Sequence, residues 1–257
     1  MDARPRRAFS AAVALVAVAA MAAIGAGTAG AETVYNNVPS PLPGNFASVG
    51  LEATSSSEFG GEIELAGTAR AKPTVTIVMS SWACEKGSVE AGCETSAKSK
   101  GFKIPVTVKV YNVGELEEGP IAERTKTVKM LYRPSTNTEK CDTERWYDAT
   151  ENACYHGFAF PISIKLGKLK KMPRRSVITV SYPHSTGPAR SLNISTSEPE
   201  EHTLSLGAQP AEEWFVNSTW SGMYCTGTPG TLGGEGGTCS TEAEGTNLQP
   251  VFAVDAN

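Results

Sequence analysis

Residues 158–166 read Phe-Ala-Phe-Pro-Ile-Ser-Ile-Lys-Leu, and their pattern indicates the fold class of the chain. Large apolar side chains occupy every second position, and small or polar side chains lie between most of them. A period of two is typical of a half-buried β-strand, because successive side chains on a strand point to opposite faces. Pro161 has no amide hydrogen for a ladder, so we expect this strand at a sheet edge or at a bulge.

The same alternation recurs along the chain. It predicts four further strands around residues 75–79, 106–110, 128–132 and 178–182. Shorter candidates lie at 49–53, 62–66, 192–196, 215–219 and 251–254. Gly, Pro, Asn and Ser cluster between these segments, and no stretch has a convincing period of 3.6. The sequence therefore predicts an all-β protein, built as a two-sheet antiparallel β-sandwich of jelly-roll-like type.

The domain organisation follows from the same reading. We expect one β-sandwich domain over residues 32–257, because no internal repeat is visible. The alternative is two immunoglobulin-sized halves separated near residues 134–142. The basic segment 167–175 is expected to link two neighbouring antiparallel strands.

The N-terminus has the organisation of a cleaved export signal. Three arginines precede an apolar run at residues 11–24, and the small residues Ala29 and Ala31 suit a signal peptidase. We therefore expect cleavage after residue 31. The apolar run is shorter than the roughly 20 residues that span a bilayer, so it is not expected to remain as an anchor. No later stretch is long and apolar, so no membrane span is expected in the mature, secreted or surface-associated chain. The paired arginines half-match a twin-arginine signal, but disulfides made outside favour general export.

The cysteines fall into three close pairs. These pairs are Cys84/Cys93, Cys141/Cys154 and Cys225/Cys239. In an oxidising compartment such pairs become disulfides, and local pairing is the economical arrangement because each pair closes its own loop. A bridge over a loop of this length contributes about 3 kcal/mol on the chain-entropy model. Zinc would need cysteines closer together, and no Cys-x-x-Cys exists. The sequence therefore predicts three local disulfides that staple loops outside the strands.

The charge balance excludes some partners. The formal net charge is −4, and no basic face is interleaved with aromatic residues, so we expect no nucleic-acid partner. The longest basic cluster consists of Lys165, Lys168, Lys170, Lys171, Arg174 and Arg175. A cluster of this size is typical of a solvated turn. Contact with an anionic wall polymer or a lipid head group is the alternative.

Three of the four tryptophans lie close to cysteines: Trp82, Trp146 and Trp220. An indole on a rigid loop could stack on a sugar ring, because the flat apolar face is preorganised. We expect Trp82 and Trp220 to pack at strand ends instead. Trp146, with Tyr147 and Tyr155, lies in a loop that is polar throughout, and these three form the candidate ligand-binding set. On this hypothesis Trp146→Ala weakens ligand retention and leaves the melting temperature nearly unchanged.

No motif for catalysis, a cofactor or a metal is present. The sequence lacks G-x-S-x-G, H-E-x-x-H, a phosphate-binding glycine loop and the EF-hand pattern, so no cofactor is expected. Glycoside hydrolysis needs two carboxylates about 5 to 10 Å apart. Glu62 and Glu64 would share one strand face, but carboxylates at this spacing more often mark the solvent side of a strand.

Five stretches carry a resemblance to a known family. They are 38–45 (Val-Pro-Ser-Pro-Leu-Pro-Gly-Asn), 57–61 (Ser-Glu-Phe-Gly-Gly), 132–135 (Tyr-Arg-Pro-Ser), 145–148 (Arg-Trp-Tyr-Asp) and 217–222 (Asn-Ser-Thr-Trp-Ser-Gly). With these motifs the mature chain resembles an uncharacterised family of exported, cysteine-paired β-rich proteins from actinobacteria and related high-GC bacteria. The resemblance implies one exported β-rich unit and carries no functional residue. The chain departs from the family at 183–189, which is short and lacks the cysteine of a loop found there.

The hypothesis drawn from the sequence is a secreted, non-catalytic binding or surface module for a polysaccharide or a cell-envelope polymer. It rests on a stapled exported sandwich with aromatic loops and no recognisable reaction centre. A secreted polysaccharide hydrolase with an unrecognised carboxylate pair is one alternative. A structural coat or protein-interaction component is the other.

Overall fold

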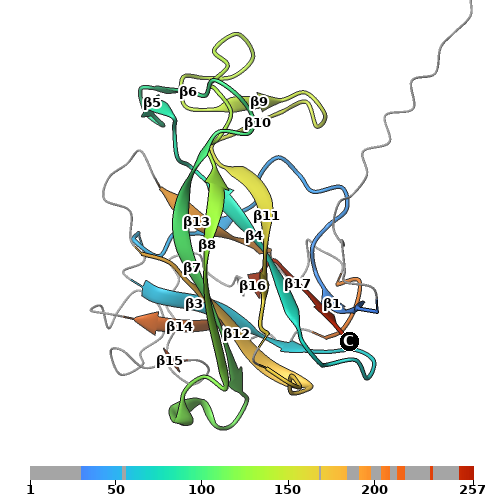
Figure 1. Ribbon diagram of the computed structural model, residues 1–257. Coiled ribbons are helices and arrows are strands. Elements are labelled where there is room, and N and C mark those ends of the chain that lie inside the picture. Colours follow the sequence, from blue (N-terminus) through green and yellow to red (C-terminus); the bar gives the residue numbers. More distant parts are fainter. Residues whose placement is uncertain are drawn as a thin grey trace, which may run out of the picture.

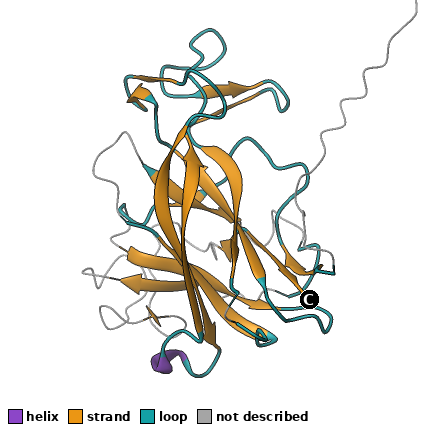
Figure 2. Cartoon of the chain, in the orientation of Figure 1, coloured by secondary structure: helices purple, strands orange, loops and turns teal. Residues whose placement is uncertain are grey.

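The computed structural model describes residues 30–53, 56–167, 169–183, 191–197, 204–208, 213–217, 232–233 and 249–257. Within these ranges the chain is all-β, as predicted, and the one helical element is a short 3-10 turn, η1 (Leu116–Glu118) (Figure 2). No helix in the described ranges is both long and apolar enough to cross a membrane. Residues 1–29 of the predicted leader lie outside the described ranges.

The first large sheet is antiparallel and six-stranded, with the order β15-β14-β3-β12-β7-β8. Its strands are β3 (Ser56–Glu64), β7 (Gly101–Asn112), β8 (Ala122–Leu131), β12 (Arg175–Ser181), β14 (Glu213–Asn217) and β15 (Leu232–Gly233). The longest pairing joins β7 to β8, from Gly101 opposite Leu131 to Val110 opposite Ala122. β8 forms one edge of this sheet (Figure 1).

The second large sheet is antiparallel and seven-stranded. Its strands are β1 (Glu32–Asn36), β2 (Ser48–Val49), β4 (Thr74–Ser81), β11 (Phe158–Lys165), β13 (Leu192–Ser197), β16 (Gln249–Pro250) and β17 (Phe252–Ala256). Among the described strands β11 pairs only with β4. The edge position that Pro161 predicts is therefore confirmed.

One apolar cluster holds buried side chains from both large sheets. Ile77 and Ile164 enter it from the seven-stranded sheet, and Val108 and Ile178 enter it from the six-stranded sheet. The alternating residues in the sequence are the ones that face this cluster, and each such side chain contributes about 1.5–3 kcal/mol when it is fully buried. Strands from both sides of residues 134–142 pair with one another, β11 with β4 and β12 with β3.

The connection between β11 and β12 differs from the prediction. These strands belong to different sheets, so residues 167–175 do not link neighbouring strands of one sheet. Leu166 and Met172 are both buried in the shared core. The segment thus crosses from one sheet to the other because its apolar side chains are buried between them.

A smaller unit stands at one end of the two sheets (Figure 1). We call it the cap and define it as residues 82–100 and 133–157. It contains two antiparallel hairpins, one made of β5 (Lys86–Ser88) and β6 (Gly92–Glu94), the other of β9 (Trp146–Asp148) and β10 (Ala153–Tyr155). Cys93 lies in β6 and Cys154 in β10, so the prediction that every cysteine sits outside the strands is wrong.

Candidate functional site: the disulfide-braced cap

Two disulfides brace the cap, and both are the predicted local pairs. Cys84 bonds to Cys93 and Cys141 bonds to Cys154, with Cα–Cα distances of 5.3 and 5.9 Å. The third predicted pair, Cys225 and Cys239, lies outside the described residues. Disulfides of this kind are typical of proteins that mature in an oxidising, extracellular environment.

Hydrogen bonds join the Cys84–Cys93 side of the cap to residues 133–136, which precede the second bridge. The Cys93 amide donates to Thr136 Oγ1 at 2.9 Å, and the Thr136 amide donates back to the Cys93 carbonyl at 2.9 Å. The Thr95 amide donates to Ser135 Oγ at 2.9 Å, and Thr95 Oγ1 donates to the Arg133 carbonyl at 2.7 Å. The cap therefore has a defined shape although few of its side chains are apolar, because covalent and hydrogen bonds replace a core.

A buried arginine lies at the base of the cap. The Arg133 side chain is fully buried, and its Nη2 donates to the Glu144 carbonyl at 2.5 Å. Among the described residues, its Nε and Nη1 have no hydrogen-bond partner. Burial lowers the pKa of Arg133 to about 10, while the carboxylates of Asp142 and Glu144 act in the opposite direction. The guanidinium thus joins the segment that follows β8 to the Cys141–Cys154 loop.

Trp146 is an internal residue of the cap. It is 5% exposed, so the expectation of an exposed indole is wrong. Its Nε1 donates to the Gly157 carbonyl at 2.6 Å, and its ring packs against Tyr155 and Phe158 at centroid distances of 5.7 Å each. A Cβ on Gly44 would lie 2.9 Å from the Trp146 ring, so the chain's own segment around Gly44 packs against this indole.

Tyr155 also contacts the chain itself. Glu151 Oε2 accepts hydrogen bonds from the Gly44 amide at 2.7 Å and from the Tyr155 hydroxyl at 3.0 Å. Burial and the adjacent Glu151 carboxylate raise the pKa of Tyr155 to about 12. Two of the three predicted ligand-binding residues therefore hold the segment around Gly44 onto the β9–β10 hairpin.

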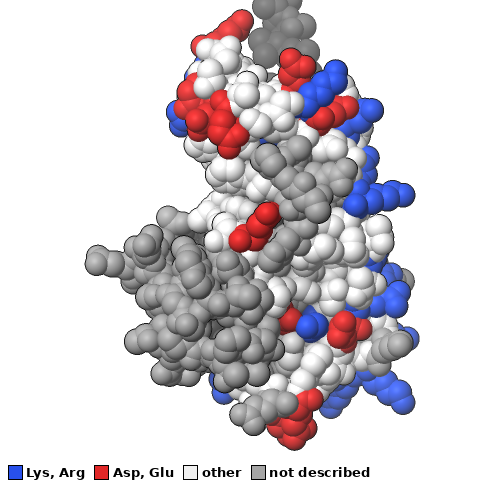
Figure 3. Space-filling view, turned by 90° about the vertical axis from the view of Figure 1, so that its left-hand side faces the viewer, with Lys and Arg blue, Asp and Glu red and all other residues white. Residues whose placement is uncertain are grey.

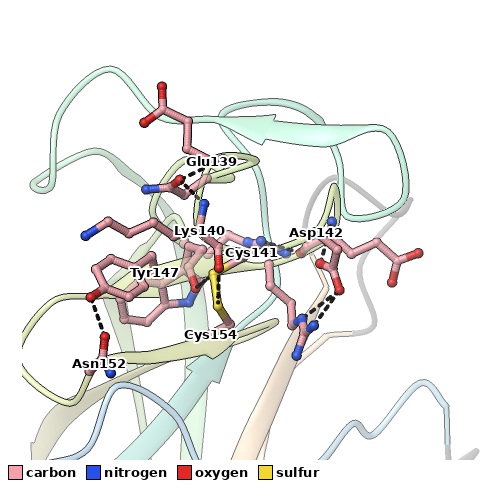
Figure 4. The surroundings of a disulfide bond; sticks show 12 residues. Glu139, Lys140, Cys141, Asp142, Tyr147, Asn152 and Cys154 are labelled. Atoms are coloured by element: carbon pink, nitrogen blue, oxygen red, sulfur yellow. Dashed lines mark hydrogen bonds and ion pairs between the residues drawn. A yellow bond between two sulfur atoms is a disulfide. The ribbon is translucent and has the colours of Figure 1, made fainter.

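Tyr147 makes its side-chain contacts with exposed residues of the cap. It is half-buried, its hydroxyl donates to Asn152 Oδ1 at 2.7 Å, and Lys140 Nζ lies 4.1 Å from its ring centroid. Lys140 and Asn152 are exposed. Figure 4 shows these three residues on one side of the Cys141–Cys154 bond, with Asp142 on the other side. We call Lys140, Tyr147 and Asn152 the tyrosine cluster.

Two features of the cap were missed by sequence reasoning. Trp82 stacks on His156 with 5.5 Å between ring centroids and 5° between planes, and His156 Nε2 lies 3.4 Å from Glu144 Oε2. Lys140 and Asn152 were also missed as neighbours of Tyr147. Both arrangements bring together residues from different turns of the cap, and no periodic pattern predicts such contacts.

The predicted carboxylate pair is not a solvent-facing pair. Glu62 is buried, and Arg175 Nε donates to its Oε1 at 2.8 Å, so the prediction that it lies on the solvent side is wrong. Glu64 is partly exposed and makes an ion pair with Arg174 at 3.0 Å. Both carboxylates lie beside arginines at the start of β12, Arg175 in the strand and Arg174 just before it, because β3 and β12 are neighbours in the sheet.

A second carboxylate of β3 is buried in a polar network. Glu58 accepts from Lys109 Nζ at 2.6 Å and from the Tyr111 hydroxyl at 2.8 Å, and Thr179 Oγ1 also donates to it. Glu62 lies four positions after Glu58 along the strand, which corresponds to about 13 Å. The described residues contain no group of three potential metal ligands.

No protein-family model, no curated protein and no solved structure matches this chain.

Proposed function

We propose that this chain is an exported, non-catalytic binding module and that the cap is its recognition surface. The observation that carries the proposal is the construction of the cap, in which two disulfides and reciprocal hydrogen bonds hold polar loops on a packed pair of sheets. Binding residues commonly sit on loops that a rigid scaffold positions, and a preorganised loop loses little entropy when a ligand binds.

The tyrosine cluster supports a saccharide-containing polymer as the ligand. Tyr147 offers an aromatic ring, Lys140 holds an ammonium group over one face of that ring, and Asn152 offers an amide within hydrogen-bond reach of the phenol. An aromatic ring packs against the apolar face of a pyranose, while amide and ammonium groups donate to hydroxyl or carboxylate oxygens. A polysaccharide or another cell-envelope polymer presents both kinds of group along its length.

Four structural expectations from the sequence form part of the same proposal. They are a jelly-roll-like β-sandwich, a single domain over residues 32–257, a third disulfide between Cys225 and Cys239, and removal of residues 1–31 on export. The shared apolar cluster supports one domain, and the two observed local disulfides support a third of the same kind. The resemblance to exported actinobacterial proteins agrees with this reading and remains part of the proposal.

The test is retention on a panel of insoluble polysaccharides and cell-wall preparations, with released reducing ends measured in the same samples. We expect Tyr147→Ala and Lys140→Ala to lower retention. The matched control is Ile121→Ala, which removes an exposed apolar side chain from the β7–β8 turn, at the end of the sheets away from the cap (Figure 1). Equal retention of all variants would refute the site, and release of reducing ends would refute the non-catalytic assignment.

A further inference from the structure

A second surface runs along the seam where the edges of the two large sheets meet. β8 is the edge strand of the six-stranded sheet, and β11 pairs only with β4 among the described strands. Lys126 Nζ donates to the Ser163 carbonyl at 3.2 Å, so the two edges lie beside each other. We call this line of contact the seam.

Basic side chains gather along the seam from both sheets. Lys126 and Arg124 come from β8, and Lys165 comes from the end of β11. Lys170 and Lys171 continue the basic surface into the connection between β11 and β12, and all five residues are exposed. Figure 3 shows Lys and Arg lining the right-hand edge of the molecule, which corresponds to the front of Figure 1, where β7 and β8 lie.

The orientation of the β8 cations follows from the strand register. Arg124 is opposite Val108 and Lys126 is opposite Val106, and both valines face the apolar cluster. Residues directly opposite each other on paired strands share a face, so Arg124 and Lys126 lie on the core side of β8. They remain exposed there, beside β11 at the edge of the other sheet.

The structure divides the basic cluster of the sequence into two parts. Arg174 and Arg175 make ion pairs with Glu64 and Glu62. In the described part of the chain Lys165, Lys170 and Lys171 make no ion pair, nor do Arg124 and Lys126. The seam thus concentrates uncompensated positive charge on a chain whose formal net charge is −4. A solvated turn alone would not bring in two cations from β8.

A groove of about 240 Å³ lies at the lower end of the seam. Ala122, Leu166 and Leu169 give it an apolar lining, and Arg124 and Lys165 line it with positive charge. Glu123 also borders the groove. The groove opens where β8 begins and β11 ends, so a chain that follows the seam would pass through it.

We propose that the seam binds a linear polyanion, a polymer that carries phosphate or carboxylate groups at regular intervals. Successive cations on one face of β8 are about 7 Å apart, which suits an extended chain with one charge per repeat. Each exposed contact is weak alone, so binding depends on several contacts at once and weakens as salt screens them. This site goes beyond the proposed function, since the cap and the seam share none of the residues that carry each proposal.

The experiment compares three forms of the oxidised protein. They are the wild type, the seam variant (Arg124→Gln/Lys126→Gln/Lys165→Gln) and the control variant (Lys86→Gln/Lys98→Gln/Lys100→Gln). The control variant is matched, because it removes the same formal charge from exposed residues that belong neither to the seam nor to the tyrosine cluster. The probes are long-chain polyphosphate and poly-L-glutamate, which separate phosphate from carboxylate recognition. Vesicles of phosphatidylglycerol form a third arm.

We expect the wild type to bind one or both polymers at about 50 mM salt and to lose them as the Debye length shortens at about 500 mM. The seam variant should bind at least about tenfold more weakly, and the control should change by less than about threefold. With polyphosphate, the slope of log affinity against log salt should fall by about two to three for the seam variant. A carbodiimide coupling of wild-type protein to poly-L-glutamate should modify peptides that contain Lys126 and Lys165.

Several results would overturn the proposal. An equal loss of polymer binding in the seam variant and the control variant would mean that binding depends only on the net charge of the protein. Binding to vesicles without binding to either polymer would replace the polymer with a lipid surface. An absence of wild-type binding, together with aggregation of the seam variant, would mean that these cations only protect the exposed strand edges. Coupling at lysines outside the seam would contradict the placement even if the variant failed to fold.

Discussion

Single side chains determine how the cap is held together. Arg133 bonds to the loop that contains Cys141, and Trp146 packs under the segment around Gly44. Both are buried in a region with few apolar residues. Each therefore joins segments that are distant in the sequence, and each is a structural residue of the cap.

Trp146→Ala is expected to lower the free energy of unfolding by about 3 to 5 kcal/mol, because it removes a buried aromatic ring. This outcome differs from the expectation for an exposed indole, which predicts almost no change in stability. Urea unfolding of the two variants Trp146→Ala and Tyr147→Ala provides the measurement. Tyr147→Ala should cost far less, since Tyr147 is only half-buried; equal costs would contradict the internal position of Trp146.

Tyr155 gives the cap a defined pH dependence. Its pKa is raised from 10.0 to about 12, so the folded chain holds this proton more tightly than the unfolded chain does. The resulting stabilisation is complete below about pH 10 and is lost as the pH rises toward 12. The difference in unfolding free energy between wild type and Tyr155→Phe should therefore shrink between pH 9 and about pH 12. A difference that stays constant over this range would refute the raised pKa.

At the scale of elements, the disulfides take the place of a core in the cap. The β5–β6 and β9–β10 hairpins have three residues in each strand, and hairpins this short are marginal in water without other support. Each hairpin carries one cysteine of a bridge. The bridge restricts the unfolded loop and thereby stabilises the folded hairpin.

Removing a bridge tests this role. Cys141→Ser/Cys154→Ser is expected to cost roughly 3 kcal/mol on the chain-entropy model, measured by thermal unfolding under oxidising conditions. We expect peptide mapping without reductant to recover Cys84 with Cys93 and Cys141 with Cys154. It should also recover Cys225 with Cys239. A crossed pair would contradict local pairing.

Strand prediction succeeded where the pattern was long and one-sided. β4, β7, β11 and β12 each face the shared core with every second side chain, and their sequences alternate accordingly. The cap hairpins have no such face, since disulfides hold them, and they were predicted as loops. The pairing of β11 with β4 could not be read from the sequence, because alternation specifies a buried face and not the neighbouring strand.

The candidate site was predictable only in outline. Its place on the Cys141–Cys154 loop follows from the cysteines and aromatic residues in the sequence. Which ring is buried depends on how Gly44 and Phe158 pack against the hairpin, and both lie outside it. The sequence therefore identifies the loop, whereas tertiary packing determines that Trp146 is buried and Tyr147 only half-buried.

At the scale of the whole molecule, the two proposed surfaces occupy different places. The cap lies at one end of the sheets, and the seam runs along one side of them (Figure 1). The tyrosine cluster combines an aromatic ring with polar groups, whereas the seam is dominated by positive charge. The two surfaces should therefore respond differently to salt, with strong salt dependence at the seam and weak dependence at the cap.

Retention of wild type and Tyr147→Ala on cell-wall and polysaccharide preparations at high salt, where the seam is screened, tests whether the cap binds the polymer. We expect the wild type to be retained without release of reducing ends, and Tyr147→Ala to be retained at least about tenfold less, equivalent to about 1.4 kcal/mol. The melting temperature of Tyr147→Ala should stay close to that of Ile121→Ala. Equal retention of wild type and Tyr147→Ala, or release of reducing ends by the wild type, would contradict the proposed function.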